Sequence, residues 1–419
     1  MDAVEMGLLH RDEHTVSASA KGEHRHGDSV VVGRGIKVLH VFKYFYPDFT
    51  GEGLYTQKIQ ALLQRHGVRA DVLVIYTAKR TGAIQEDETA GFDEIFYFGL
   101  GAQREQATLI PLLRFFLRHA RAYDLIHFHS QVDRSFSSHL LLKLFGVPIV
   151  RSCTLDDSPG EIIRSYRPLR RWLARHLMGS IDRFITISPR LYQDGLRIYS
   201  KAKVTMIPQG VSLPATSVAD RSAAPSCGQR GGVLQRLELL YVGAIQDRKD
   251  VIFLIETLPL LRARLNGRFD VRLKIVGPDL EWKSYGIAVR RRVRDLDLEE
   301  SVVFLGYVRD PEQNYLDADL FVFASVLEGF GNAIIEAMSY GLPVVVRTLP
   351  GVTDFIVESG RNGFLFGNAN DYIETVVRLA DDPALRQEVG RQARADVGER
   401  FSLESISHRY RALYEELVR

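Results

Sequence analysis

The protein has 419 residues, of which 46% are hydrophobic and 25% are charged, and its net charge is only +2. These proportions are typical of globular proteins and exclude a disordered or fibrous chain. A nucleic-acid-binding protein is not favoured, because such proteins usually carry a strongly basic domain. The length indicates two or three domains.

The two cysteines, Cys153 and Cys227, form no Cys-x-x-Cys pair, so we expect neither a disulfide framework nor a cysteine-based zinc site. Residues 1–35 are mostly polar and lack the apolar segment of a signal peptide, which predicts a disordered tail. No apolar run reaches the roughly 18 residues that a membrane span needs. We therefore expect a cytoplasmic protein.

From Ile36 onward, short apolar runs alternate with helical patterns. Strands are expected first at residues 36–42, 71–76, 94–98, 124–128, 147–150, 183–187 and 203–207. A stretch of small residues at 213–236 predicts a flexible linker. After it, strands are expected at residues 237–242, 271–276, 302–305, 320–324 and 343–346. This alternation predicts βαβ units and a doubly wound parallel sheet in each half.

The domain organisation follows from these patterns. We expect Rossmann-like domains at residues 36–212 and 237–400, and a final helical segment at 401–419. In open α/β sheets, ligands bind beyond the carboxyl ends of the strands. The cleft between the two domains is therefore the expected site.

The sharpest motif follows the strand expected at 320–324. Gly329 and Gly331 allow a tight turn that leaves backbone N–H groups at the start of a helix. Glu328 lies in this loop, and we expect Glu336 about two turns into the helix. Such carboxylates can accept hydrogen bonds from a sugar diol. The alternative is an ordinary strand–loop–helix with two solvated glutamates.

A second motif follows the strand expected at 237–242. Arg248 and Lys249 lie at this junction of strand and helix, where two cations and a helix N-terminus can neutralise a diphosphate. A solvated basic pair is the alternative.

Together, these segments resemble the C-terminal domain of glycosyltransferase family 4, whose members are retaining enzymes of the GT-B fold. Glu328 and Glu336 match the family's Glu-x7-Glu signature in spacing and in the Gly-Phe-Gly-Asn between them. Residues 207–211 resemble its Ile-Pro-Asn-Gly-Val turn, with Gln209 in place of Asn. The resemblance implies two doubly wound domains facing a central cleft, with the C-terminal helix at 401–419 packing back on the N-terminal domain.

The resemblance also implies roles for the charged residues. Arg248 and Lys249 would hold the donor diphosphate and stabilise the departing nucleotide, so that both count as catalytic and donor-binding. Glu336 would bind the ribose hydroxyls, and Glu328 would contact the transferred sugar as a catalytic residue. Further donor contacts are implied for Gly329, Phe330, Gly331 and Asn332. The sequence departs from the family at Ala244, where an arginine is common.

The first half contains a glycine-rich loop, in which Glu52 separates Gly51 from Gly53. It resembles the family's Pro-x-x-x-Gly-Gly loop, which implies that Gly51 and Gly53 lie near the donor phosphates. An ordinary turn is the alternative.

His129 ends the strand expected at 124–128, where an imidazole can meet a sugar hydroxyl. The family carries a histidine there, which implies a catalytic role, although an isolated histidine at a strand end is often structural. We expect His127 to point to the opposite side of the strand and to take no part.

Asp156 lies after the next expected strand. Its carboxylate is a candidate for binding acceptor hydroxyls or a metal ion, and capping of a turn at residues 157–159 is equally consistent.

The implied function is that of a retaining glycosyltransferase (EC 2.4, hexosyltransferase type). It would move a sugar from a UDP- or GDP-sugar to a hydroxyl of a glycan, a lipid-linked sugar or a small molecule, in polysaccharide, lipopolysaccharide or glycolipid biosynthesis. The resemblance implies no metal and no other cofactor. A catalytically silent sugar-binding or scaffold protein and a nucleotide-sugar epimerase of the same fold remain alternatives.

Two stretches, 112–121 and 164–178, combine apolar and basic residues. Helices of this composition can lie on an anionic membrane surface, although a core-facing helix with a basic outer face gives the same pattern. The first of these interpretations predicts peripheral contact with the inner face of a membrane.

Overall fold

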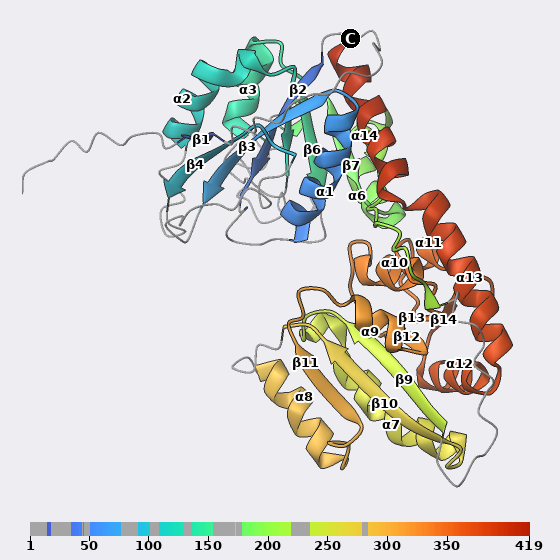
Figure 1. Ribbon diagram of the computed structural model, residues 1–419. Helices are drawn as coiled ribbons and strands as arrows, with labels where there is room; N and C mark the ends of the chain where they lie inside the picture. The colour runs from blue at the N-terminus through green and yellow to red at the C-terminus, as the bar shows by residue number, and fades with distance from the viewer. Residues whose placement is uncertain are drawn as a thin grey trace, which may run out of the picture. The chain divides into compact units, whose positions relative to one another are not determined.

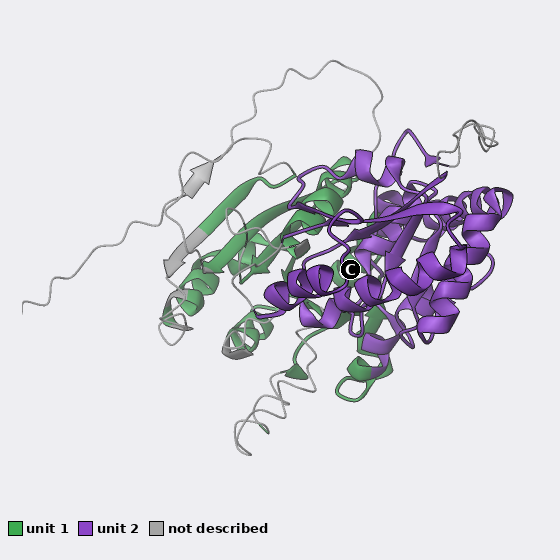
Figure 2. Ribbon diagram, turned by 90° about the horizontal axis from the view of Figure 1, so that it is seen from below, with its two compact units in different colours: residues 1–186, 194–207, 407–419 green, residues 187–193, 208–406 purple. Residues whose placement is uncertain are grey.

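The computed structural model describes residues 15–17, 35–43, 45, 51–76, 91–100, 109–129, 136–153, 172, 178–218, 235–278 and 284–419. The chain divides into two units (Figure 2). The first unit contains residues 1–186, 194–207 and 407–419, and the second contains residues 187–193 and 208–406.

The first unit is built on a sheet whose strands follow the order β1-β4-β3-β2-β5-β6-β7-β8 (Figure 1). Its strands are β1 (Thr15–Ser17), β2 (Ile36–Phe42), β3 (Val68–Tyr76), β4 (Glu94–Leu100), β5 (Leu125–Phe128), β6 (Ile149–Cys153), β7 (Arg183–Thr186) and β8 (Val204–Met206). From β4 to β8 every neighbouring pair is parallel. The order reverses between β2 and β5, as in a doubly wound Rossmann sheet.

Helices follow most of these strands along the chain. They are α1 (Gly51–Arg65), α2 (Leu109–His119), α3 (Phe136–Leu144) and α6 (Pro189–Leu196), with short 3-10 turns at η3 (Ala120–Ala122) and η5 (Lys201–Lys203). The helix α14 (Leu403–Val418) ends the chain, and its residues from Ser407 onward belong to the first unit. Tyr414 on this part of α14 contacts the buried His127 of β5.

One strand departs from the sequence-based prediction. Residues Thr15–Ser17, within the stretch expected to be a disordered tail, form β1 antiparallel to β4. The prediction was therefore wrong for these three residues. An edge strand offers unpaired backbone groups to any extended segment, and Thr15 and Val16 are β-branched residues that favour extended backbone.

The second unit contains a parallel sheet in the order β11-β10-β9-β12-β13-β14. Its strands are β9 (Gln235–Val242), β10 (Phe269–Val276), β11 (Val302–Gly306), β12 (Leu320–Phe323), β13 (Val344–Arg347) and β14 (Phe364–Phe366). All four residues of β12 are buried, as expected for a parallel strand whose two faces are both covered. The predicted architecture of two doubly wound parallel sheets is confirmed.

The helices of the second unit are η7 (Asp247–Lys249), α7 (Val251–Leu265), α8 (Ser284–Asp295), α9 (Glu312–Asp317), α10 (Asn332–Ser339), α11 (Thr353–Ile356), α12 (Ala369–Asp381) and α13 (Pro383–Arg400). Among the helices that the structure describes, none is both long enough and apolar enough to cross a membrane.

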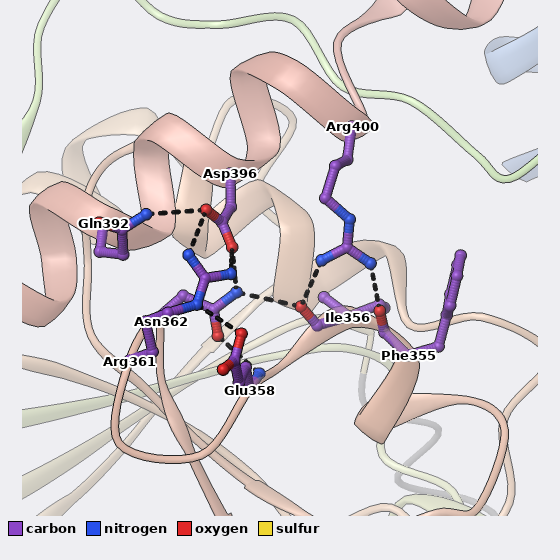
Figure 3. Close-up of polar contacts among 8 residues, drawn as sticks. All are labelled: Phe355, Ile356, Glu358, Arg361, Asn362, Gln392, Asp396 and Arg400. Carbon is purple, nitrogen blue, oxygen red and sulfur yellow. Dashed lines mark hydrogen bonds and ion pairs between the residues drawn. The ribbon is translucent and has the colours of Figure 1, made fainter.

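A polar network fixes the loop after α11 to α13 (Figure 3). The nearly buried Asp396 carboxylate accepts hydrogen bonds from Arg361, Asn362 and Gln392. Burial opposes ionisation of Asp396, but these hydrogen bonds outweigh it and lower its pKa. Arg400 donates to the backbone carbonyls of Phe355 and Ile356, so that the C-terminal end of α11 is tied to α13.

Candidate active site

In the second unit, two loops meet where the strand order reverses between β9 and β12, which is the usual ligand position in such sheets. The loop after β9 contains Arg248 and Lys249, and the loop after β12 contains Ser325. The Val326 amide donates to the carbonyl oxygen of Arg248 over 2.8 Å, and the Ser325 hydroxyl oxygen lies 3.0 Å from the same carbonyl. The fold thus brings together two loops that lie about 80 residues apart, as their numbering shows.

The carboxylate of Glu328 is the centre of this site. Its Oε1 pairs with Lys249 Nζ, lies 3.2 Å from Arg248 Nη1, and accepts a 2.6 Å hydrogen bond from Ser325 Oγ. Burial lowers the pKa of Lys249, and the Glu328 carboxylate opposes that shift. Two cations against one carboxylate leave a local excess of positive charge, which suits a phosphate group.

The helix α10 begins after Gly331, whose φ of +110° is one that glycine adopts readily. An added Cβ there would lie 2.9 Å from Ile334 Cδ1. Because the glycine loop stays non-helical as far as Gly331, Glu336 lies one turn into α10 rather than the expected two. Asn332 at the start of α10 donates a 2.7 Å hydrogen bond to Gln209.

The side chain of Phe330 is buried in the core of the second unit, against Phe355 and Phe401. Only its backbone is therefore suited to ligand contact, which is the role that the resemblance implies. Gly329 lies beside it in the same loop.

Glu336 accepts a 3.0 Å hydrogen bond from the hydroxyl of Tyr315. Burial and the neighbouring carboxylate raise the pKa of Tyr315, so that the phenol keeps its proton and donates. Tyr340 stacks on Tyr315 with 4.9 Å between ring centroids. Neither the hydrogen bond nor the stacking was predicted, because no local pattern links residue 315 to residue 336.

The first unit has its own reversal point, between β2 and β5. Gly51 and Gly53 lie in the first turn of α1, after β2, and His129 directly follows β5. Glu52, between the two glycines, has its Oε1 3.5 Å from Nδ1 of His129. Burial lowers the pKa of His129 to about 3, so that the ring is neutral near pH 7.

The expectation that His127 points away from His129 is wrong. The two rings stack with 4.0 Å between their centroids, because side chains two residues apart on a strand point to the same side. The nitrogens of His127 lie 2.8 Å from the Tyr414 hydroxyl and 2.7 Å from the Ser152 hydroxyl. His40 of β2 completes the cluster, with Nδ1 2.8 Å from Nε2 of His129.

The histidines His40, His127 and His129 bring one nitrogen each within 4.8 Å of one another. Neutral imidazoles at that spacing are the ligands that zinc prefers. Both nitrogens of His127, however, already have hydroxyl partners. The cluster is therefore better described as a hydrogen-bond network than as a set of metal ligands.

The predicted acceptor residue Asp156 lies outside the described residues, as do most of the predicted linker and of the basic stretch at 164–178. His40 was missed, although a histidine inside an otherwise apolar strand is a signal, since buried polar side chains usually serve a purpose.

Known proteins are similar to this chain in sequence and in fold. Residues 236–382 match the family described as "Glycosyl transferases group 1", and residues 50–210 match "Glycosyl transferase 4-like domain". The D-inositol 3-phosphate glycosyltransferase of Pseudarthrobacter chlorophenolicus is 27% identical over 367 residues, covering 83% of this chain and 86% of that protein. The alpha-D-kanosaminyltransferase of Streptomyces kanamyceticus is 26% identical, covering 77% and 85%.

Among solved structures, Anabaena Alr3699/HepE superimposes with a TM-score of 0.70 at 21% identity, covering 91% of this chain and all of that one. The sucrose-phosphate synthase of Thermosynechococcus elongatus gives a TM-score of 0.68 at 21% identity, covering 91% and 99%. The two family matches lie one in each half of the chain, and both structures share its fold. The chain therefore belongs to the group 1 glycosyltransferases and is an enzyme with the GT-B fold.

Proposed function

We propose that this enzyme transfers a sugar, with retention of configuration, from a UDP- or GDP-sugar to a hydroxyl acceptor. The observation that carries the proposal is the cluster of Arg248, Lys249 and Glu328 at the reversal point of the second sheet. A UDP-sugar is favoured, because solved neighbours of the same fold are complexes with UDP and with UDP-glucose.

The chemistry follows from the charges. As the bond between sugar and diphosphate breaks, negative charge grows on the departing phosphate, and cations fixed nearby stabilise it without having to reorganise. Lys249 and Arg248 supply those cations, and they require no metal ion in that role. Glu336, held by Tyr315, would accept hydrogen bonds from the ribose hydroxyls.

The test is release of free nucleotide from a panel of UDP-, GDP- and ADP-sugars, without added metal. Lys249→Ala and Glu336→Ala should reduce release at least tenfold. Matched controls are Arg291→Ala on α8 and Glu374→Ala on α12, both at exposed positions, and these should leave it unchanged. Release that survives in Lys249→Ala would contradict the assignment, and failure to bind any nucleotide would favour a scaffold role.

We also propose that the acceptor is a glycan or lipid-linked sugar at an anionic membrane surface. The helices α2 and α3 contact each other and expose Ile110, Leu117, Leu140 and Leu144. Arg114 and Arg118 are exposed on the same side of α2 as Ile110 and Leu117, at helical spacing. Neither helix contains an acidic residue, a composition that favours anionic lipid.

Sedimentation with vesicles of phosphatidylglycerol and phosphatidylcholine tests this face. The double variant Leu117→Asp/Leu144→Asp should lose most of its vesicle binding. Leu260→Asp, at a comparably exposed leucine of α7 in the second unit, should retain it. Equal binding of both variants would contradict a role for α2 and α3.

A further inference from the structure

The histidine cluster of the first unit is part of a chain of hydrogen bonds. The orientation of the Gln60 amide indicates which atom is the donor and which is the acceptor along this chain. Nε2 of Gln60 donates to the carbonyl oxygen of Val68 over 2.9 Å. This bond fixes the orientation of the amide, so that Oε1, an acceptor, faces Nε2 of His40 at 3.4 Å. This contact favours the His40 tautomer that carries its proton on Nε2.

The tautomer of His40 in turn determines which nitrogen of His129 is protonated. His40 is buried, and burial together with His129 lowers its pKa well below the usual value, so that the ring is neutral and carries one proton. With that proton on Nε2, Nδ1 of His40 is an acceptor. It lies 2.8 Å from Nε2 of His129, which must therefore be the protonated nitrogen of a ring that is itself neutral.

The remaining nitrogen of His129, Nδ1, then bears a lone pair. It lies 3.5 Å from Oε1 of Glu52, so that two acceptors face each other at the end of α1 that follows β2. Their lone pairs repel, and a hydrogen donated to both of them would relieve that repulsion. The ring has no freedom to turn, because it is stacked between Phe42 and His127 at centroid distances of 4.3 and 4.0 Å. Hydroxyl hydrogens are the groups that such a pair of acceptors would receive.

We propose that Gln60 and His40 are positioning residues that hold His129 as its Nε2–H tautomer, so that Nδ1 accepts a hydrogen bond from a substrate hydroxyl beside Glu52. The inference rests on the proposed function only in taking a sugar as the substrate. Gln60 and His40 act on the substrate only through His129.

The first measurement is the protonation of the ring nitrogens in the full-length enzyme, by ¹⁵N nuclear magnetic resonance with labelled histidine. The signals of His129 are identified by their loss in His129→Asn. We expect Nε2 protonated and Nδ1 unprotonated in the native enzyme. The reverse pattern would overturn the proposal whether or not the enzyme transfers a sugar.

The second measurement uses variants of Gln60. Gln60→Met removes the acceptor and should leave His129 as a mixture of tautomers, with a fall in kcat of about tenfold or more. Gln60→Glu keeps an acceptor facing His40 and should restore both the tautomer and most of the rate. Ile59→Val, a buried neighbour on α1, is the control for packing and should behave as the native enzyme.

A further measurement distinguishes failure of this positioning role from failure of the proposed glycosyltransferase function. Nucleotide affinity, measured by calorimetry, should be the same in Gln60→Met and the native enzyme, because the proposed diphosphate site lies in the second unit. A native tautomer ratio or a native rate in Gln60→Met would overturn the proposal. Loss of rate without recovery in Gln60→Glu would also overturn it, since it would indicate a purely structural role.

Discussion

At the scale of single residues, the candidate site in each unit depends on groups whose protonation is set by burial. In the second unit, Tyr315 keeps its proton and donates to Glu336. In the first, His40, His127 and His129 are held neutral. Each arrangement fixes which atom donates and which accepts, and that is what recognition of sugar hydroxyls requires.

Tyr315→Phe should weaken donor binding without abolishing it. The variant removes one hydrogen bond to a carboxylate, a loss of about 1.5 kcal/mol at the lower end of the range for bonds to charged groups, so that the KM for the donor should rise about tenfold while kcat changes little. Tyr340→Phe, which keeps the stacked ring, is the control. A fall in kcat with an unchanged KM would show that Tyr315 acts at another step.

The histidine cluster should make the first unit sensitive to acid. Histidines that stay neutral when folded take up protons on unfolding once the pH falls below about 6.5. The free energy of unfolding should therefore be at its full value above pH 7. Below about pH 6.5 it should decline by up to about 1.4 kcal/mol per pH unit for each such histidine.

Urea unfolding between pH 7.5 and pH 5 measures this decline. His129→Asn should flatten the pH dependence by the contribution of one histidine, whereas Gln64→Ala, at an exposed position on α1 that does not titrate, should not. An identical slope in the native protein and in His129→Asn would show that His129 is protonated in the folded state.

At the scale of elements, the candidate site of the second unit depends on the close approach of two loops at the ends of β9 and β10. Gly277 has a φ of +145°, and a Cβ added to it would lie only 2.1 Å from the carbonyl oxygen of Gly243. No side chain fits there without moving the loop that continues to Arg248. The glycine thus positions the proposed phosphate-binding loop through the backbone alone.

Gly277→Ala should destabilise the second unit by more than about 3 kcal/mol, because a left-handed φ and a backbone clash act together. Gly267→Ala separates the two effects, since Gly267 has a φ of +69° with nothing within 4 Å of an added Cβ. It should cost only about 1 to 2 kcal/mol. Equal melting temperatures for the two variants would refute the proposed role of the close approach.

The sequence patterns predicted most of the strands, but they did not predict the side-chain contacts between distant residues. The strand β12 was found because four buried apolar residues in a row leave a strong local signal. The three-residue strand β14 was missed, since so short a run has no periodicity. The bond between Gln60 and His40 joins residues 20 positions apart, and only the folded sheet brings them together.

At the scale of the whole molecule, the enzyme contains two sheets with the same order of winding, each with polar groups at its own reversal point. The first offers the neutral His129 ring beside the Glu52 carboxylate, and the second offers cations around Glu328. This difference supports a division of labour in which the second unit binds the nucleotide diphosphate. The first unit would then receive sugar hydroxyls.

The most direct test of this division is calorimetric titration of UDP and of GDP into the native enzyme, Lys249→Met and His129→Asn. We predict that one nucleotide binds the native enzyme, that Lys249→Met weakens it at least tenfold, and that His129→Asn leaves it unchanged. Undiminished binding by Lys249→Met, with the variant folded, would contradict the assignment of the diphosphate to the second unit.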